Sequence, residues 1–342
     1  MHPSTESWDS ERRELLARRI SDLGLSIEGT AVERMTQQLY AELSARSLRF
    51  HPPVYLSDQW GCPDGTPLIG VPFYLADPRL SRIEEENAVE IEGEEDAMRF
   101  LRHEAGHAFN YAYRLYDRPD WHQTFGPYSR PYRDRYRSDP FSRAFVRHIL
   151  GWYAQKHPDE DFAETFAVWL TPGRDWRREY AGWGALAKLE YVDRVMAEVA
   201  DTAPVVPALT PDDLPVEEMH YTIADHYRDA EERIPIDDAA HFDGDLRTIF
   251  ASGDESPEGE GAGRFLGRHR REVVGRIAYW TGESAAMVRQ FVDFLAERAD
   301  ALQLRVRGLE AATLIELTAF GTAVMMNYRH TDALDGISDE DR

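Results

Sequence analysis

The sequence predicts a mainly helical α+β protein with one small sheet, and three observations lead to this fold class. Apolar residues recur at helical spacing in segments near residues 11–47, 94–116, 158–171 and 264–328. Two short β-prone runs, "PPVYLSD" and "TPLIGVPFYLAD", follow the first of these segments. The turn residues "GCPDG" separate the two runs, so we expect a small sheet after the amino-terminal helices.

Length and charge exclude several classes of partner. The chain has 342 residues, of which 42% are hydrophobic, and this is enough for one large or two modest globular domains. Its 62 acidic and 39 basic residues give a formal net charge of −23, which works against binding to nucleic acid or to anionic lipid. An acidic surface of this kind either keeps the protein in solution or attracts a basic peptide or protein. We therefore expect no nucleic-acid partner and no membrane partner.

The chain has a single cysteine, Cys62, and this limits both the possible disulfides and the possible metal ligands. No intrachain disulfide can form, so any metal must be held by His, Asp or Glu. The amino terminus, "MHPSTESWDSERRELL", lacks a basic-then-apolar leader, and no apolar run approaches the roughly 20 residues of a spanning helix. These features indicate a cytoplasmic protein.

Composition predicts three regions along the chain. Residues 1–202 contain the amino-terminal helices, the small sheet and the motifs that carry chemistry. A linker is expected over residues 203–263, because "DTAPVVPALTPDDLP" is rich in proline and "ASGDESPEGEGAG" is polar and rich in glycine. Residues 264–342 are expected to form a helical carboxy-terminal extension that serves as core or as a partner-binding bundle.

The segment "EGEEDAMRFLRHEAGHAFNYAYRLYDRPD" predicts one long helix from about Glu94 to Tyr116, with acidic residues in its first turn and a proline after its end. Within it, "HEAGH" places His103 and His107 one turn apart on one face, so both imidazoles can reach one cation. Glu104 follows the first histidine and can contact a water on that cation without being a ligand. The competing interpretation is two solvent-facing histidines on an ordinary helix.

A cation held in this way supports hydrolysis. It lowers the pKa of a bound water, and the Glu104 carboxylate takes the proton as the water attacks a carbonyl. A catalytic zinc site usually has three protein ligands, so a third must be found. The metzincin pattern is excluded because Tyr113 stands where its third histidine would be. His122, after a proline-rich turn, and His148, on a basic and apolar helix, are alternatives.

Glu164 is the third ligand that the sequence favours. It lies in the middle of the helix predicted for "HPDEDFAETFAVWLTPG", between Phe162 and Phe166, where an unpaired carboxylate would cost several kcal/mol and a metal would compensate it. The competing interpretation pairs Glu164 with an arginine of "SRPYRDRYR". Glu160 and Asp161, one turn earlier, are expected to be charges of the helix start or acceptors that orient a ligand histidine.

These two motifs carry a resemblance to a known superfamily. "HEAGH", followed about 50 residues later by "DEDFAETFAVWL", resembles the two-histidine, one-glutamate form of the zincins, and bacterial zinc-binding metallopeptidases in particular. The resemblance covers about residues 50–195. It implies a zincin-like metallopeptidase domain with zinc on His103, His107 and Glu164, and with Glu104 as general base for a peptide or protein substrate. The alternative is a zinc-stabilised binding or regulatory protein with little or no catalysis.

The similar anthrax lethal factor-like peptidases have a tyrosine shortly before the third ligand, which stabilises the oxyanion. At the equivalent offset from Glu164 this chain has His157, and Tyr153 lies one turn further upstream. Both are candidate catalytic residues, and Tyr128 and Tyr132 of the preceding loop are alternatives. By the same analogy, the substrate cleft is expected along the strand in "GVPFYLADP".

Overall fold

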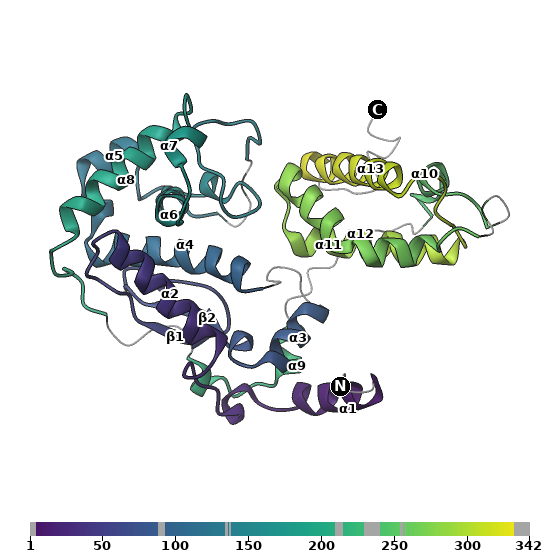
Figure 1. Ribbon diagram of the computed structural model, residues 1–342, viewed down its shortest axis with the longest axis horizontal. Helices are drawn as coiled ribbons and strands as arrows, with labels where there is room; N and C mark the ends of the chain where they lie inside the picture. The colour runs from purple at the N-terminus through teal and green to yellow at the C-terminus, as the bar shows by residue number, and fades with distance from the viewer. Residues whose placement is uncertain are drawn as a thin grey trace. The chain divides into compact units, whose positions relative to one another are not determined.

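The computed structural model describes residues 5–87, 93–133, 138–208, 215–228, 240–253 and 258–331, together with residues 136 and 256. The chain divides into two compact units, Met1–Ala230 and Glu231–Arg342. Helices dominate both units, and the described strands belong to a single two-stranded sheet in the first (Figure 1). The prediction of a mainly helical protein with one small sheet is therefore confirmed.

The first unit begins with helices and the small sheet. Strands β1 (Val54–Ser57) and β2 (Ile69–Pro72) are parallel, with Val54 opposite Ile69. The helices up to and including the long central one are α1 (Thr5–Leu16), η1 (Ile20–Leu23), α2 (Ala31–Ala45), η2 (Phe73–Ala76), α3 (Pro78–Asn87) and α4 (Glu94–Ala112). After these come η3 (Leu115–Asp117), α5 (Pro119–Phe125), η4 (Tyr153–Gln155), α6 (Pro158–Leu170), α7 (Trp176–Glu179), α8 (Ala185–Val199), η5 (Val216–Glu218) and α9 (Ile223–Arg228).

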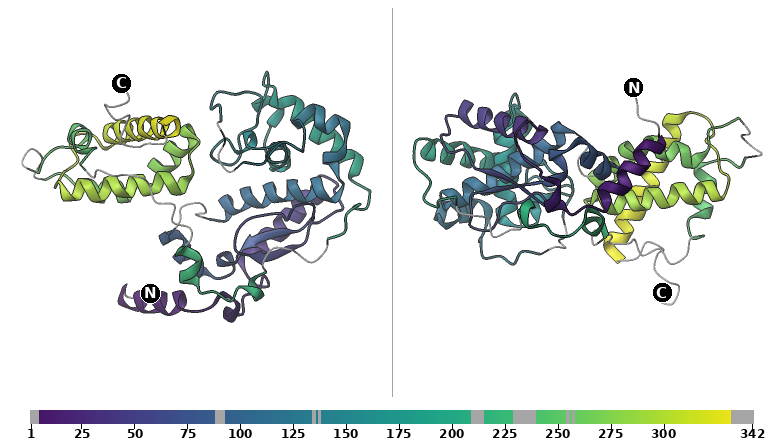
Figure 2. Two further views of the ribbon diagram at one scale, coloured as in Figure 1. Left: turned by 180° about the vertical axis from the view of Figure 1, so that it is seen from behind. Right: turned by 90° about the horizontal axis from the view of Figure 1, so that it is seen from below.

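Helix α4 lies at the centre of the first unit, between α6 on one side and α2 with β2 on the other (Figures 1 and 2). Residues 103–112 of α4 are buried without a break, and α6 is buried along its whole length. Helices that are buried on every side are normally apolar, yet these two carry histidines and carboxylates. Buried polar side chains need hydrogen-bond partners, and several of those on α4 and α6 find them across the contact between the two helices.

Gly106 allows α6 to approach α4 closely. A Cβ at this position would lie 2.7 Å from the Cα of Ala163 and 3.1 Å from the Cβ of Phe166. The shorter distance is one that real Cβ atoms essentially never show, and the neighbour there is backbone that cannot rotate away, while the longer distance would require Phe166 to shift slightly. The two helices thus cross where Gly106 meets Ala163. His103 and His107 flank the glycine on α4, so they face the acidic residues of α6.

The second unit consists of α10 (Asp243–Ile249), α11 (Ala262–Thr281), α12 (Ala285–Ala301) and α13 (Glu310–Thr331). Helix α11 packs against both α12 and α13. The core between these helices contains Phe265, Ile277, Phe291 and Leu295, all buried. Within the described part of the chain, none of the helices combines the length and apolar character that a membrane crossing requires.

The predicted linker, residues 203–263, does not form a separate region, because the boundary between the two compact units falls within it. The backbone N–H of Ile20 donates to the carbonyl of Tyr221, and that of Ser21 donates to the carbonyl of Met219. Val216 and Met219, which directly follow the proline-rich stretch of residues 201–215, are buried in the core of the first unit, so this part of the predicted linker is packed. Residues 209–214 and 229–239 of the predicted linker lie outside the described residues.

Gly106→Ala is expected to lower the free energy of unfolding of the first unit by about 1–2 kcal/mol. Overpacking at the crossing costs about 1–3 kcal/mol, and the better helix propensity of alanine returns up to about 1 kcal/mol. Urea unfolding followed by circular dichroism measures the change.

Gly267→Ala on α11 is the matched control, because nothing lies within 4 Å of a Cβ added there. It should leave stability unchanged or raise it by up to about 1 kcal/mol. A stabilising Gly106→Ala would contradict the close approach of α4 and α6.

Candidate metal centre

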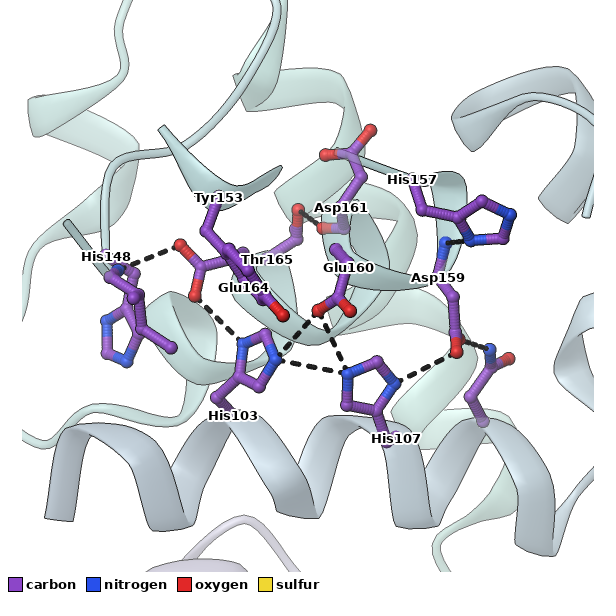
Figure 3. Close-up of polar contacts among 12 residues, drawn as sticks. His103, His107, His148, Tyr153, His157, Asp159, Glu160, Asp161, Glu164 and Thr165 are labelled. Carbon is purple, nitrogen blue, oxygen red and sulfur yellow. Dashed lines mark hydrogen bonds and ion pairs between the residues drawn. The ribbon is translucent and has the colours of Figure 1, made fainter. Parts of the chain in front are cut away.

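Three electron-donating atoms meet where α4 and α6 cross (Figure 3). Nε2 of His103 lies 3.1 Å from Nε2 of His107, and Oε2 of Glu160 lies 3.0 Å from the first and 3.2 Å from the second. All three residues are buried, and together they could hold a metal ion. Zinc bonds of about 2.0–2.1 Å place tetrahedral ligand atoms about 3.3 Å apart, so the triangle has the size that such an ion requires.

The other ring nitrogen of each histidine faces a carboxylate. Nδ1 of His103 lies 2.9 Å from Oε1 of Glu164, and Nδ1 of His107 lies 3.1 Å from Oδ2 of Asp159. An ionised carboxylate can only accept, so each Nδ1 carries a proton and donates. The Nε2 lone pairs are then free to face Glu160. This is the usual arrangement of a metal-binding histidine.

The two carboxylates that hold the histidines are themselves held. Asn110 donates to Oδ1 of Asp159 over 2.6 Å, and the hydroxyl of Tyr111 donates to Oδ2 over 2.6 Å. Oε2 of Glu164 accepts from the backbone N–H of Ile149 over 2.9 Å. The orientation of both imidazoles is therefore fixed from outside the ligand triangle.

Electrostatics make the triangle attractive to positive charge. Burial alone would lower the pKa of His103, but hydrogen bonds with Glu160 and Glu164 raise it to about 9. Burial also opposes the charged form of His107, yet Asp159 and Glu160 raise its pKa well above the ordinary value. Burial raises the pKa of Glu160, and the two histidines outweigh this and lower it well below the usual range. Protons or a cation must balance these carboxylates, and the donor set suits a divalent cation.

The structure differs from the sequence prediction in the third ligand. Glu164 faces Nδ1 of His103 from outside the triangle, whereas Glu160 faces both Nε2 atoms. The two glutamates lie one turn apart on the same face of α6, so their spacing alone does not separate them. The position at which the two helices cross, Gly106 against Ala163, determines which glutamate lies between the histidines, and that glutamate is Glu160. The group that could hold a metal therefore contains Glu160, and Glu164, predicted as a ligand, lies on the outer nitrogen of His103.

His157, predicted as a catalytic candidate, caps α6. Its Nδ1 accepts from the backbone N–H of Asp159 over 3.2 Å, and its Nε2 donates to the carbonyl of Arg130 over 2.8 Å. Pro158 follows at the first helical position, where a missing N–H costs nothing. With both ring nitrogens bound to backbone, His157 serves the start of the helix and has no free group for chemistry.

Tyr153 and Tyr132 lie on the cleft side of the triangle. The ring of Tyr153 is 5.6 Å from that of His103, between centroids. Burial, followed by the charge of Glu160, raises the pKa of Tyr153, so its hydroxyl stays protonated and can donate. In the resembling peptidases the oxyanion tyrosine precedes the third ligand by a fixed number of residues. The same number counted back from Glu160, instead of from Glu164, leads to Tyr153. Tyr128 donates to Asp64 instead, over 3.1 Å.

A cleft of about 480 Å³ opens beside the triangle. It is lined by Trp60, Gly61, Cys62, Asp64, His103, Glu104, His107, Tyr111, Tyr128, Arg130, Tyr132, Tyr153, His157, Asp159 and Glu160. Burial raises the pKa of Glu104, which brings this carboxylate closer to the range of a general base.

The strand expected to border the cleft lies behind it. All four residues of β2 are buried, and Gly70 forms an antiparallel bridge with Gly61. Trp60, Gly61, Cys62 and Asp64 of the preceding turn line the cleft in place of "GVPFYLADP".

The alternative histidine ligands lie apart from the triangle. Nε2 of His148 lies 2.9 Å from the carbonyl of Arg99, and burial lowers the pKa of His148 to about 4. Nδ1 of His122 lies 3.3 Å from the carbonyl of Gly126. Among the residues that the structure describes, neither belongs to the group that could hold a metal.

Comparisons of the chain with protein-family models, with curated proteins and with solved structures give no match. They neither support nor contradict the resemblance carried by the two motifs. The function therefore has to be inferred from the geometry of the site, and above all from His103, His107 and Glu160.

Glu160→Gln and Glu164→Gln separate the two assignments of the third ligand. Loss of the Glu160 carboxylate removes one of three ligands, so the affinity for zinc should fall by more than about 100-fold. Loss of the Glu164 carboxylate weakens only the orientation of His103, and such partners typically contribute about 10–100-fold. Competition with a chromogenic chelator measures both. A larger loss for Glu164→Gln would restore Glu164 as the ligand.

Proposed function

We propose that the protein is a zinc-dependent metallopeptidase that hydrolyses a peptide or amide bond in a zincin-like site. The observation that carries this proposal is the convergence of both histidine Nε2 atoms and one Glu160 oxygen within 3.0–3.2 Å of one another. Each histidine also has a carboxylate on its other nitrogen. A long helix with "HEAGH" and a following helix with the acidic ligand support the zincin-like interpretation.

The donor set favours zinc in a catalytic site. Two imidazoles and one carboxylate are ligands that zinc accepts readily, and sites with three protein ligands leave a position for water. Structural zinc sites are usually closed by four protein ligands. Among the residues that the structure describes, the group that could hold a metal has three members, and a cleft lies beside it. These two features favour catalysis over a purely structural ion.

The side chains around the site then have separate tasks. Zinc, when bound, supplies a Lewis acid and lowers the pKa of water. Glu104 accepts the proton of the attacking water and passes it to the leaving amine. Tyr153 donates to the oxygen of the substrate carbonyl as it gains negative charge. Asp159 and Glu164 keep the two imidazoles in place.

The substrate class follows from the cleft and the net charge. An extended peptide with a basic character would be attracted by a chain of formal net charge −23. Apart from the residues that hold the metal and its histidines, the cleft is lined by the acidic side chains of Asp64 and Glu104 and by the basic side chain of Arg130. We therefore propose a peptide or protein substrate whose basic character is favoured by the net charge of the whole chain.

Glu104→Gln should retain zinc and lose turnover by about 10²–10⁴-fold, because the amide cannot accept the proton. Zinc content by elemental analysis and cleavage of a peptide library by mass spectrometry measure the two quantities. Equal cleavage by Glu104→Gln and the wild type would contradict the role of the base. A zinc-loaded wild type that cleaves no peptide would favour a zinc-stabilised binding protein.

Tyr153→Phe should lower kcat by about 10²-fold, the usual effect of removing one donor to an oxyanion. Its zinc affinity should stay unchanged. Tyr40→Phe is the matched control, since the Tyr40 hydroxyl donates to the carbonyl of Pro52 over 2.7 Å, outside the residues that line the cleft. If both variants keep the kcat of the wild type, Tyr153 does not act on the substrate.

A further inference from the structure

Tyr132 reaches the buried ligand carboxylate from an irregular segment between α5 and η4. Its side chain is 52% exposed, whereas Glu160 is 4% exposed. The hydroxyl of Tyr132 lies 2.5 Å from Oε1 of Glu160. Oε2 of the same carboxylate faces the two histidines. The two oxygens of Glu160 therefore have different environments, and Tyr132 accounts for the difference.

The direction of each hydrogen bond follows from the number of protons. An ionised carboxylate only accepts, so the single hydroxyl proton of Tyr132 goes to Glu160. The hydroxyl of Tyr153 lies 3.3 Å from that of Tyr132. Because the proton of Tyr132 goes to Glu160, Tyr153 is the donor in this pair while no substrate is bound, and its proton is released to the carbonyl oxygen when a substrate enters. A chain of donors thus runs from Tyr153 through Tyr132 to Glu160.

We propose that Tyr132 is a positioning residue, whose hydroxyl holds one oxygen of Glu160 so that the other alone faces the metal. This inference rests on the proposed function, because Glu160 needs a fixed orientation only as a ligand. It goes beyond the ligand set, since it assigns a task to a residue of the loop.

Each of the other ligands already has a partner of this kind. Asp159 holds His107 and Glu164 holds His103 through their outer ring nitrogens. Among the described residues, Glu160 faces the Nε2 atoms of the two histidines through Oε2, and its Oε1 accepts a hydrogen bond from Tyr132. Tyr132 thus completes the outer set of contacts, and each such contact typically contributes about 10–100-fold in metal affinity.

The ring of Tyr132 is itself held at the start of α6. It lies 5.3 Å from the ring of His157, between centroids. The ammonium nitrogen of Lys156 lies 4.3 Å from the ring centroid, a favourable cation–π distance. Both neighbours directly precede α6, the helix that carries Glu160. The phenol and the carboxylate therefore belong to one local framework.

Tyr132→Phe tests the proposal through zinc affinity, measured by chelator competition on the full chain. The variant should bind zinc about 10–100-fold more weakly than the wild type. Tyr136→Phe is the matched control, because the Tyr136 hydroxyl donates to the carbonyl of Gly151 over 2.6 Å in the same segment. It should stay within about threefold of the wild type, well below the effect of an outer contact. Circular dichroism verifies that both variants fold.

A second comparison tests whether Tyr132 acts through Glu160. In a Glu160→Ala background, adding Tyr132→Phe should cause no further loss of zinc affinity. An unchanged affinity in Tyr132→Phe, equal losses in Tyr132→Phe and Tyr136→Phe, or a further loss in the double variant would each overturn the assignment. A wild type that binds no zinc would instead overturn the proposed function itself, and with it the need for a positioning residue.

Discussion

The close approach of α4 and α6 is the constraint on which the site depends. Gly106 removes the side chain that would hold the helices apart, and the Cα of Ala163 takes the space. Polar residues on two buried helices are thereby brought within hydrogen-bond distance. Because these side chains are buried, His103 and His107 find carboxylate partners on α6. The same contact that packs the core thus assembles the triangle of His103, His107 and Glu160.

Charge balance explains why such a crossing calls for a cation. Two imidazoles face three carboxylates, those of Asp159, Glu160 and Glu164, and all of these side chains are buried. Removing charges from water without compensation is costly, and protonated histidines would compensate only part of this. A divalent ion in place of the two Nε2 protons would supply the same two positive charges, and the imidazoles and Glu160 would bind it directly. Binding and stability of the first unit are therefore expected to be coupled.

The sequence predicts the local features of the site and misses those set by packing. The helix expected from Glu94 is found as α4, and "HEAGH" does place both histidines on one face. The sequence favoured Glu164 over Glu160 as the ligand, but one turn of helix separates the two residues, and the packing of α6 on α4 brings Glu160 to both Nε2 atoms. The contact of Tyr132 comes from an irregular segment without periodicity. Burial near Met219 likewise depends on distant residues, so proline content alone suggested a linker.

A crystal structure of the zinc-loaded protein, with an anomalous difference map at the zinc edge, tests the ligand set most directly. We expect a single peak bonded to Nε2 of His103, Nε2 of His107 and one oxygen of Glu160, with Glu164 remaining on the outer nitrogen of His103. A peak bonded to Glu164 instead, or no peak between the two imidazoles, would contradict the proposed metal centre.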